Sequence, residues 1–463
     1  MRSSRSDSAI LQSPLCILHF ELIPVSRSHL REILALGLPA ILAQASLPIL
    51  NISETAMIGR LGAEALAARA IGAAIIGSVY WVFAFLTFGT TTLIGLHFGA
   101  GDKKSCGQTY LHALFLALVG GLAVAAAGNM FAESLYRWLG AENAVVAAGA
   151  GYFRLYIASA PATLMVYCSV GFLRGIQNTR TPLAIAFVTT AIQLVLDYGL
   201  IYGHFGLPIL GLSGAAAAAC FAQLCGAMIY LTLFLTSEHN AEYRAVPWRI
   251  TRAGLRPLFR IGQDLAIRTG ALRLSLVFAT SSAARMGAAT LSAYEIIFQL
   301  FMLCSDVIDG LAIAGQALTA KFLGEGQVKS ANRMGVTLTL AGLATGMLFA
   351  LGFLTAWQFI VDFFTGSAEV IALLTVKIML LVCLFQPLNG IVFVLDGLLI
   401  GARDTRYLMW AMLAGGLCLF LPIAWAAGQY NWGLMGIVSA IGALMLTRLA
   451  TNLFRFLGRK WAS

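Results

Sequence analysis

The sequence predicts an all-α polytopic membrane protein with twelve transmembrane helices in two pseudo-symmetric lobes of six. Composition is the first observation that predicts this fold class. Hydrophobic residues make up 59% of the 463-residue chain and charged residues only 11%, which is far outside the range of soluble domains. The apolar runs are long and continuous rather than short and alternating, and this excludes a transmembrane β-barrel.

An internal repeat is the second observation. Matching segments recur along the chain at an offset of about 225 residues. The pairs are RLGA from Arg60 and RMGA from Arg285, GDKK from Gly101 and GQVK from Gly326, and GFLRGIQNTRTP from Gly171 and GLLIGARDTRYL from Gly397. Three pairs at one offset indicate two copies of one fold unit. Two similar helical bundles facing each other is an arrangement typical of secondary transporters.

The individual helices follow from hydropathy, because a spanning helix needs roughly 20 mostly apolar residues. Several of the apolar segments exceed this minimum, so tilted or kinked helices are expected. The twelve predicted spans are 34–59, 68–98, 107–132, 147–174, 181–203, 209–236, 263–284, 290–322, 333–360, 369–401, 407–427 and 433–456.

These spans divide the chain into two lobes joined by its one long polar interruption. The first thirty residues are rich in Ser and Arg and read as a cytoplasmic tail, with an organelle-targeting segment as the alternative. The predicted parts are a tail at 1–30, an N-lobe at 31–236, a linker at 237–257, a C-lobe at 258–457 and a tail at 458–463.

The distribution of Lys and Arg predicts the orientation. With both termini cytoplasmic, the inner loops and tails hold most of the basic residues. The opposite side then has little beyond Arg60, Arg137 and Arg285, as the positive-inside rule requires. The net charge of +10 therefore indicates contact with anionic membrane lipid and not with nucleic acid. We expect a multi-pass, monomeric protein of the cell membrane, or of an organelle membrane if the tail is a targeting segment.

Other function classes find no support in the motifs. No G-x-x-x-x-G-K-[ST] phosphate loop occurs, which argues against an ATP-driven pump within this chain. The eight cysteines show no CxxC spacing and the six histidines are scattered, so neither a metal site nor another cofactor is expected. We expect no enzyme activity.

Ionisable residues inside the spans are the candidates for function, because a charge in mid-membrane costs about 2.5–3.5 kcal/mol or more. Asp264 and Arg268 lie one helical turn apart and predict a local ion pair. The other acids are Glu54, Asp197, Asp306, Asp309 and Asp396, and the bases are Arg69, Arg154, Arg268, Arg273 and Lys377.

Glu54 and Asp197 are the strongest candidates for ion coupling. Neither has a base within one helical turn, both lie toward the outer ends of N-lobe helices, and Gln193 is one turn from Asp197 on the same face. Two carboxylates sharing a poorly hydrated pocket take up a proton readily. The alternative is that each only holds the bundle together by hydrogen bonding. Neither acid recurs at the 225-residue offset, so the scaffold is duplicated and the acids are not.

Several motifs resemble the multidrug and toxic compound extrusion (MATE) transporters, and within them the DinF-like branch. The resemblance covers about residues 31–457. Its segments are ISETAMIGRLGAEALAA from Ile52, GFLRGIQNTRTPL from Gly171, QDLAIRTGALRLSLVF from Gln263, IDGLAIAGQAL from Ile308 and LDGLLIGARDT from Leu395.

The resemblance implies two six-helix lobes in a V, with drug-like substrates expelled in exchange for protons or sodium ions. Glu54 and Asp197 match the family's coupling carboxylates, and Pro39 matches a helix-one proline at which the helix is proposed to bend. The chain departs from the family in having Glu54 in place of Asp, Gln193 in place of Asn, and Ala219 in place of a hydroxyl residue. Sodium needs several hard oxygen ligands, so protons are the expected coupling ion.

We therefore expect a proton-coupled antiporter that exports small organic substrates by alternating access. The open alternatives are an exporter of organic, aromatic anions and a flippase for a lipid-linked precursor. A C-lobe polar site is possible at Asp306, Asp309, Asp396, Lys377 and Arg273, and an N-lobe one at Arg154.

Overall fold

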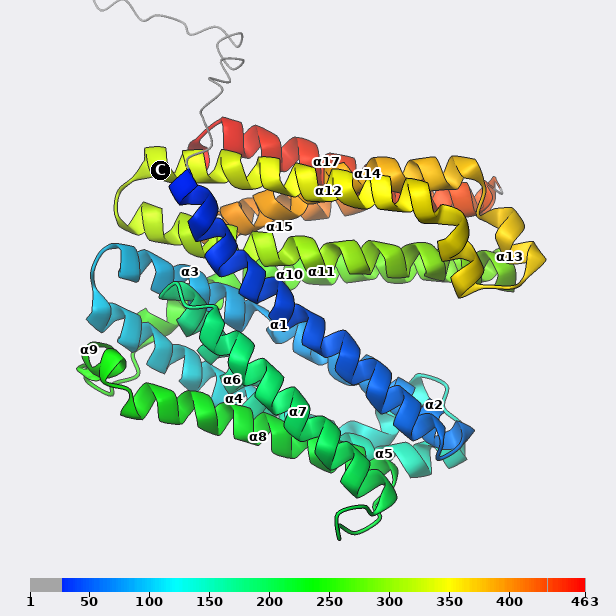
Figure 1. The fold of residues 1–463 in the computed structure, drawn as a ribbon, viewed down its shortest axis with the longest axis horizontal. Helices are drawn as coiled ribbons and strands as arrows, with labels where there is room; N and C mark the ends of the chain where they lie inside the picture. Colours follow the sequence, from blue (N-terminus) through cyan, green and yellow to red (C-terminus); the bar gives the residue numbers. More distant parts are fainter. Residues whose placement is uncertain (1–26, 431, 463) are drawn as a thin grey trace, which may run out of the picture.

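The computed structural model describes residues 27–430 and 432–462, and these residues form helices joined by short loops (Figure 1). The predicted tail at 1–30 lies largely outside the described residues. In the first half of the chain, the helices are α1 (Arg27–Gly59), α2 (Ala63–Phe83), α3 (Phe85–Gly99), α4 (Lys103–Trp138), α5 (Asn143–Ile157), α6 (Ala160–Gly175), α7 (Arg180–Tyr202) and α8 (Leu212–Thr236).

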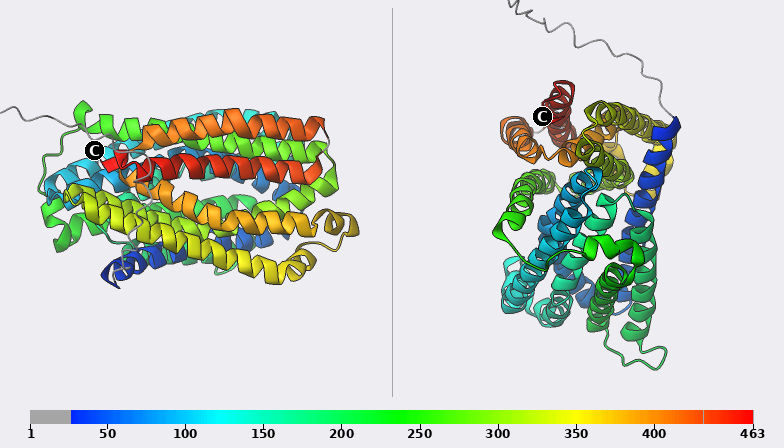
Figure 2. Two further views of the ribbon diagram at one scale, coloured as in Figure 1. Left: turned by 90° about the horizontal axis from the view of Figure 1, so that it is seen from above. Right: turned by 90° about the vertical axis from the view of Figure 1, so that its left-hand side faces the viewer.

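The second half repeats this order after a short 3-10 turn, η2 (Glu238–Asn240), and one turn of helix, α9 (Ala241–Arg244). Its elements are α10 (Arg252–Arg285), α11 (Ala288–Gly324), α12 (Val328–Phe364), α13 (Ala368–Leu373), α14 (Val376–Gly401), α15 (Thr405–Gly415), the π-helical turn η3 (Gly416–Phe420), α16 (Leu421–Gln429), α17 (Gly433–Leu457) and η4 (Lys460–Ala462). Figure 1 shows α4–α8 in one half of the molecule and α11–α17 in the other, with α1 running diagonally between them. Figure 2 shows the same two groups of helices from above and from the end.

The internal repeat predicted from the sequence is also present in the backbone conformation of the turns. At each of the three landmark pairs, both copies place a residue in the left-handed region of φ, where the chain leaves one helix and enters the next. The pairs and their φ angles are Gly62 and Gly287 (120° and 113°), Gly101 and Gly326 (73° and 71°), and Gln177 and Arg403 (64° and 62°). The sequence similarity is therefore strongest where the backbone conformation is most demanding, and glycine meets that demand at two of the three pairs.

The membrane-spanning segments agree with the prediction in position but not in every detail. Ten stretches of the described residues are long and apolar enough to cross a membrane, and α5 with α6, bent by 45°, is an eleventh. The predicted span at 263–284 lies in α10, which is long enough at 34 residues but is not apolar enough to be counted among these stretches. The predicted span at 369–401 is divided between α13 and α14.

Helix α10 begins at Arg252, inside the segment 237–257 that was predicted as the linker between the lobes. The hydroxyl of Thr251 accepts a hydrogen bond from the Gly254 amide (3.2 Å) and caps the helix. The Thr251 amide donates to Nε2 of the buried His112 in α4 (3.0 Å), and Gln108 Nε2 donates to the Arg249 carbonyl (2.6 Å). The start of α10 is therefore fastened to α4.

Candidate functional site

The first candidate site lies in the N-lobe, where Glu54 of α1 is buried and paired. Arg69 of α2 places Nη2 3.2 Å from Glu54 Oε2, and both side chains are at most 10% exposed. The same Nη2 is 3.4 Å from the Asn51 carbonyl oxygen. Glu54 is thus neutralised by a residue 15 positions away in sequence, which helical periodicity alone does not predict.

Asp197 of α7 is buried without a partner. Its exposed fraction is 0%, and neither carboxylate oxygen has a hydrogen-bond partner within the described part of the chain. The charges of Glu54 and Arg69 act on this carboxylate, so the two predicted acids share one region. Tyr202, near the end of α7, donates its hydroxyl to the Met57 carbonyl (2.7 Å), and this contact holds α7 against α1.

Three tyrosines lie close to the Glu54–Arg69 pair. Tyr152 and Tyr156 of α5 lie within electrostatic range of Glu54 and Arg69, with their ring centroids 6.0 Å apart. The buried Tyr136 of α4 donates its hydroxyl to the Ala68 carbonyl, next to Arg69 (2.8 Å). The Glu54–Arg69 pair therefore lies beside rings and hydroxyls instead of open water. Gln193 is also buried, at 4% exposure, one turn before Asp197.

Pro39 lies inside α1, which continues through it to Gly59. A proline has no amide hydrogen, so the carbonyl of Ala35 one turn earlier loses its helical partner. The Thr179 hydroxyl, 3.4 Å away in the turn before α7, donates to that carbonyl instead. Whether α1 bends at Pro39 remains a prediction.

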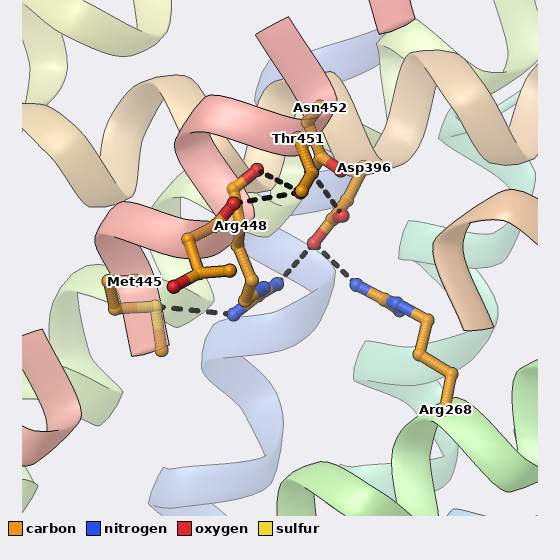
Figure 3. Close-up of polar contacts among 7 residues, drawn as sticks. Arg268, Asp396, Met445, Arg448, Thr451 and Asn452 are labelled. Atoms are coloured by element: carbon orange, nitrogen blue, oxygen red, sulfur yellow. Dashed lines mark hydrogen bonds and ion pairs between the residues drawn. The ribbon is translucent and has the colours of Figure 1, made fainter. Parts of the chain in front are cut away.

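The second candidate site is a buried charge cluster in the C-lobe, drawn in Figure 3. Asp396 of α14 accepts hydrogen bonds from the guanidinium groups of Arg268 in α10 and Arg448 in α17. Its other oxygen accepts from Asn452 Nδ2 at 2.8 Å. Two cations on one carboxylate leave a positive charge, and the charges of both arginines also act on Asp309 of α11. The cluster ties α10, α14 and α17 together.

The prediction of an Asp264–Arg268 pair is wrong. Asp264 instead accepts a hydrogen bond from the Thr405 hydroxyl (2.8 Å), while Arg268 turns toward Asp396. Long-range partners in a packed bundle were available to both groups, and burial favours the pairings that satisfy them most completely.

The structure does not bring the other predicted polar residues into one site. Lys377 is exposed in the first turn of α14 and makes no ion pair within the described ranges. The Arg273 guanidinium lies 3.6 Å from the centroid of the Trp81 ring, so it contacts the N-lobe. Arg154 pairs at an exposed position with Glu133 (3.2 Å). Asp306 is half-buried, and its charge acts on Asp309.

Three residues of the C-lobe cluster were absent from the predicted C-lobe site: Arg268, which was expected to pair with Asp264, Arg448 and Asn452. Arg448 is a lone charge deep in the predicted span 433–456. The free-energy cost of placing a charge in mid-membrane, which identified the other candidate ions, would therefore have identified Arg448 as well. Asn452 carries no charge and gives no such signal. Chemically, the Asp396 carboxylate has both of its oxygens hydrogen-bonded, whereas neither oxygen of Asp197 has a partner among the described residues, so Asp197 can accept a proton or a hydrogen bond.

A two-lobed bundle of spanning helices with ionisable groups buried in each lobe defines a membrane transporter. The MatE family model matches residues 39–199 and 271–426, and the chain belongs to this family of transporters, not to a class of enzymes. The expected MATE membership and the helical fold are confirmed.

The relatives cover nearly the whole chain. The chain is 28% identical over 440 residues to the chloroplastic Protein DETOXIFICATION 44 of Arabidopsis thaliana, and the alignment covers 92% of this chain and 81% of the relative. It is 24% identical over 423 residues to DNA damage-inducible protein F of Escherichia coli (89% and 90% covered). It is 27% identical over 456 residues to a probable multidrug resistance protein NorM of Bradyrhizobium diazoefficiens (94% and 96% covered).

Solved structures show the same fold. A MOP superfamily transporter from Pyrococcus furiosus superposes with a TM-score of 0.82 at 19% identity, covering 92% of this chain and 94% of the other. A mutant MATE transporter of Vibrio cholerae superposes with a TM-score of 0.84 at 21% identity, covering 92% and 96%.

Proposed function

We propose that this protein is a secondary active antiporter that exports small organic substrates in exchange for protons, with Asp197 as the proton carrier. The observation that carries the proposal is the unpartnered burial of Asp197 beside an already paired acid. A buried carboxylate without partners is costly when ionised and is relieved by a proton. Binding a proton can therefore favour one conformation over another.

The pairing of Glu54 refines the role expected for the two acids. Arg69 supplies the countercharge to Glu54, which leaves Asp197 as the acid without compensation. A sodium ion at Glu54 would have to bind beside a guanidinium group, and its repulsion disfavours a second cation there. These contacts support proton coupling over sodium coupling and assign Glu54 a positioning role.

Substrates are proposed from the chemistry around this site and from the relatives. Several relatives are named as multidrug resistance proteins, which supports export of drug-like molecules. Near Glu54, a group of tyrosines offers ring faces and edges: Tyr156 lies within electrostatic range of Glu54, Tyr80 and Tyr167, and Tyr80 and Tyr167 meet edge-on at 6.4 Å between centroids. Aromatic organic cations combine favourably with rings and a carboxylate.

Alternating access is supported by close contact of the lobes at one end of the bundle. Gln316 of α11 donates from Nε2 to the Phe88 carbonyl (2.7 Å) and to the Thr92 hydroxyl of α3 (2.9 Å). A Cβ at Gly99 of α3 would overlap the Lys321 carbonyl oxygen of α11, and a Cβ at Gly324 would overlap the Leu96 carbonyl oxygen. The lobes thus meet backbone to backbone where both helices end. We propose that this end, which carries the linker and the start of α1, faces the cytoplasm and is closed here.

Replacing Gly99 by Val is expected to hinder this closure. The added side chain meets a backbone carbonyl that cannot move aside, and such overpacking typically costs about 1–3 kcal/mol, which corresponds to a loss of about 5- to 150-fold in the ratio of closed to open protein. Initial transport rates in vesicles should fall by a similar factor. The matched control is Gly352→Val in α12, where nothing lies within 4 Å of the added Cβ. Equal rates for both variants would contradict a closure at Gly99.

The proposed function is tested by substrate uptake into everted vesicles containing the native protein, with proton and sodium gradients imposed separately. We expect uptake of an aromatic organic cation to follow the proton gradient and to collapse with a protonophore. Uptake that follows sodium alone would overturn the assigned coupling ion. Failure to move any of a panel of cations and anions under either gradient would overturn the antiporter proposal.

The alternatives make different demands on the arginines. A flippase for a lipid-linked anion, or an exporter of aromatic anions, needs cations that are available to the substrate. Within the described helices, Arg69 is paired with Glu54, Arg268 and Arg448 share Asp396, and Arg273 lies on Trp81. The anion arm of the vesicle panel tests both alternatives directly.

We further propose a monomer that spans the membrane many times with both termini cytoplasmic. The chloroplastic names of two Arabidopsis relatives keep an organelle membrane as the alternative to the cell membrane. Fluorescent fusions at each terminus, combined with protease protection, distinguish these locations and orientations.

A further inference from the structure

A groove beside the linker combines cationic and apolar side chains, and it lies apart from the acids of the transport site. It runs between α4 and α10, has a volume of about 520 Å³, and is lined by Leu116, Arg252, Leu255, Arg256, Phe259, Arg260 and Gln263. We call this set the α4–α10 groove. One wall belongs to each lobe.

The three arginines of the groove have no countercharge among the described residues. Arg252, Arg256 and Arg260 are exposed and form no ion pair within residues 27–430 and 432–462. They recur every four residues, so they lie within an arc of about 80° on one face of α10. Three like charges on one face repel each other, and an anion between them removes that repulsion.

The groove is also apolar on one side, and the apolar track continues toward the membrane interior. Phe259 is 62% exposed, and further along the same face of α10 Ile267 and Leu274 are 39% and 72% exposed. These three positions fall within an arc of about 80° of one another. A free inorganic anion cannot bury these exposed apolar side chains, whereas an acyl chain can.

The height of the groove fits the head-group layer. At 1.5 Å per residue, the 34 residues of α10 extend about 50 Å, well beyond a hydrocarbon core of about 30 Å. The surplus includes the first turns of the helix, which carry the arginines. Trp248, 67% exposed in the linker, is a residue type that favours the membrane interface.

We propose that the α4–α10 groove binds the head group of an anionic phospholipid, with its phosphate among Arg252, Arg256 and Arg260 and an acyl chain along Phe259, Ile267 and Leu274. The lipid contacts both lobes at the point where Thr251 and His112 fasten α10 to α4. This inference does not depend on the coupling ion or on the transported substrate.

The test is thermal unfolding of the purified full chain in neutral detergent, titrated with phosphatidylglycerol, phosphatidylcholine or inorganic phosphate. We expect phosphatidylglycerol alone to raise the unfolding temperature in a saturable manner. With three arginines replaced, as in R252Q/R256Q/R260Q, the apparent affinity should fall about a hundredfold, and in R256Q alone about fivefold. The single variant keeps the test valid if the triple variant folds poorly.

The matched control is K329Q/R333Q/R406Q, which removes three exposed charges from the same end of the bundle, outside the groove. It should bind phosphatidylglycerol as the native protein does. An equal loss in this control would show general surface charge and overturn the site. Stabilisation by inorganic phosphate to the same extent would assign the groove to a free anion, and equal stabilisation by phosphatidylcholine would exclude head-group recognition.

Discussion

Proton-driven export is expected to disappear when Asp197 is replaced by Asn. The substitution keeps the size of the side chain but removes the group that can gain and lose a proton. Because both carboxylate oxygens of Asp197 are buried without hydrogen-bond partners, a neutral amide should fold at least as well as the native acid. Uptake in everted vesicles should fall to the level of vesicles without transporter, while the unfolding temperature stays equal or rises.

The control for Asp197→Asn is Asp362→Asn, which removes an exposed carboxylate near the end of α12 that accepts a hydrogen bond from Gln358. It should transport normally. Full proton-dependent transport by the Asp197 variant, with the protein correctly folded, would exclude Asp197 as the proton carrier.

The largest expected loss of stability follows from replacing Asp396 by Asn. Asp396 is the carboxylate shared by Arg268 and Arg448, and without it two buried cations lose their countercharge. Breaking a buried pair in this way costs about 3–5 kcal/mol. Unfolding in detergent, followed by tryptophan fluorescence, should show this loss as a lower midpoint with an unchanged slope.

Glu133→Gln is the matched control, because Glu133 also serves two arginines, Arg137 and Arg154, but at an exposed position. Exposed pairs contribute about 0–1 kcal/mol, so this variant should be nearly as stable as the native protein. Adding Arg448→Met to Asp396→Asn should recover part of the loss, since it removes one of the uncompensated charges. Equal stability of Asp396→Asn and Glu133→Gln would show that the C-lobe cluster is hydrated and contributes little.

The sequence was informative wherever a property depends on neighbouring residues. Hydropathy over about 20 residues located the spans, and the left-handed turns at Gly62 and Gly287 follow from a repeat that is visible by eye. The same reasoning was inaccurate at α10, where capping by Thr251 starts the helix inside the predicted linker. Helix starts depend on which side chain reaches the free amides, and single residues decide this.

Partners of the buried charges could not be predicted in the same way. Asp264 and Arg268 are neighbours on one helix, yet each binds a different element. Glu54 and Arg69 lie on consecutive helices, and nothing in their spacing shows that the two helices turn these side chains toward each other.

By itself, the sequence determined the class of this protein: a duplicated bundle of spanning helices, the residues at its turns, and the short set of ions inside it. Composition and periodicity suffice for this, because the membrane imposes the same cost on every buried charge and every unpaired amide. Only the tertiary structure decided which partner each ion has. Among the described residues, it paired Glu54 with Arg69, placed Asp396 between two arginines, and left the Asp197 carboxylate without a hydrogen-bond partner, because the partners of a buried charge are the groups that packing brings within hydrogen-bond distance.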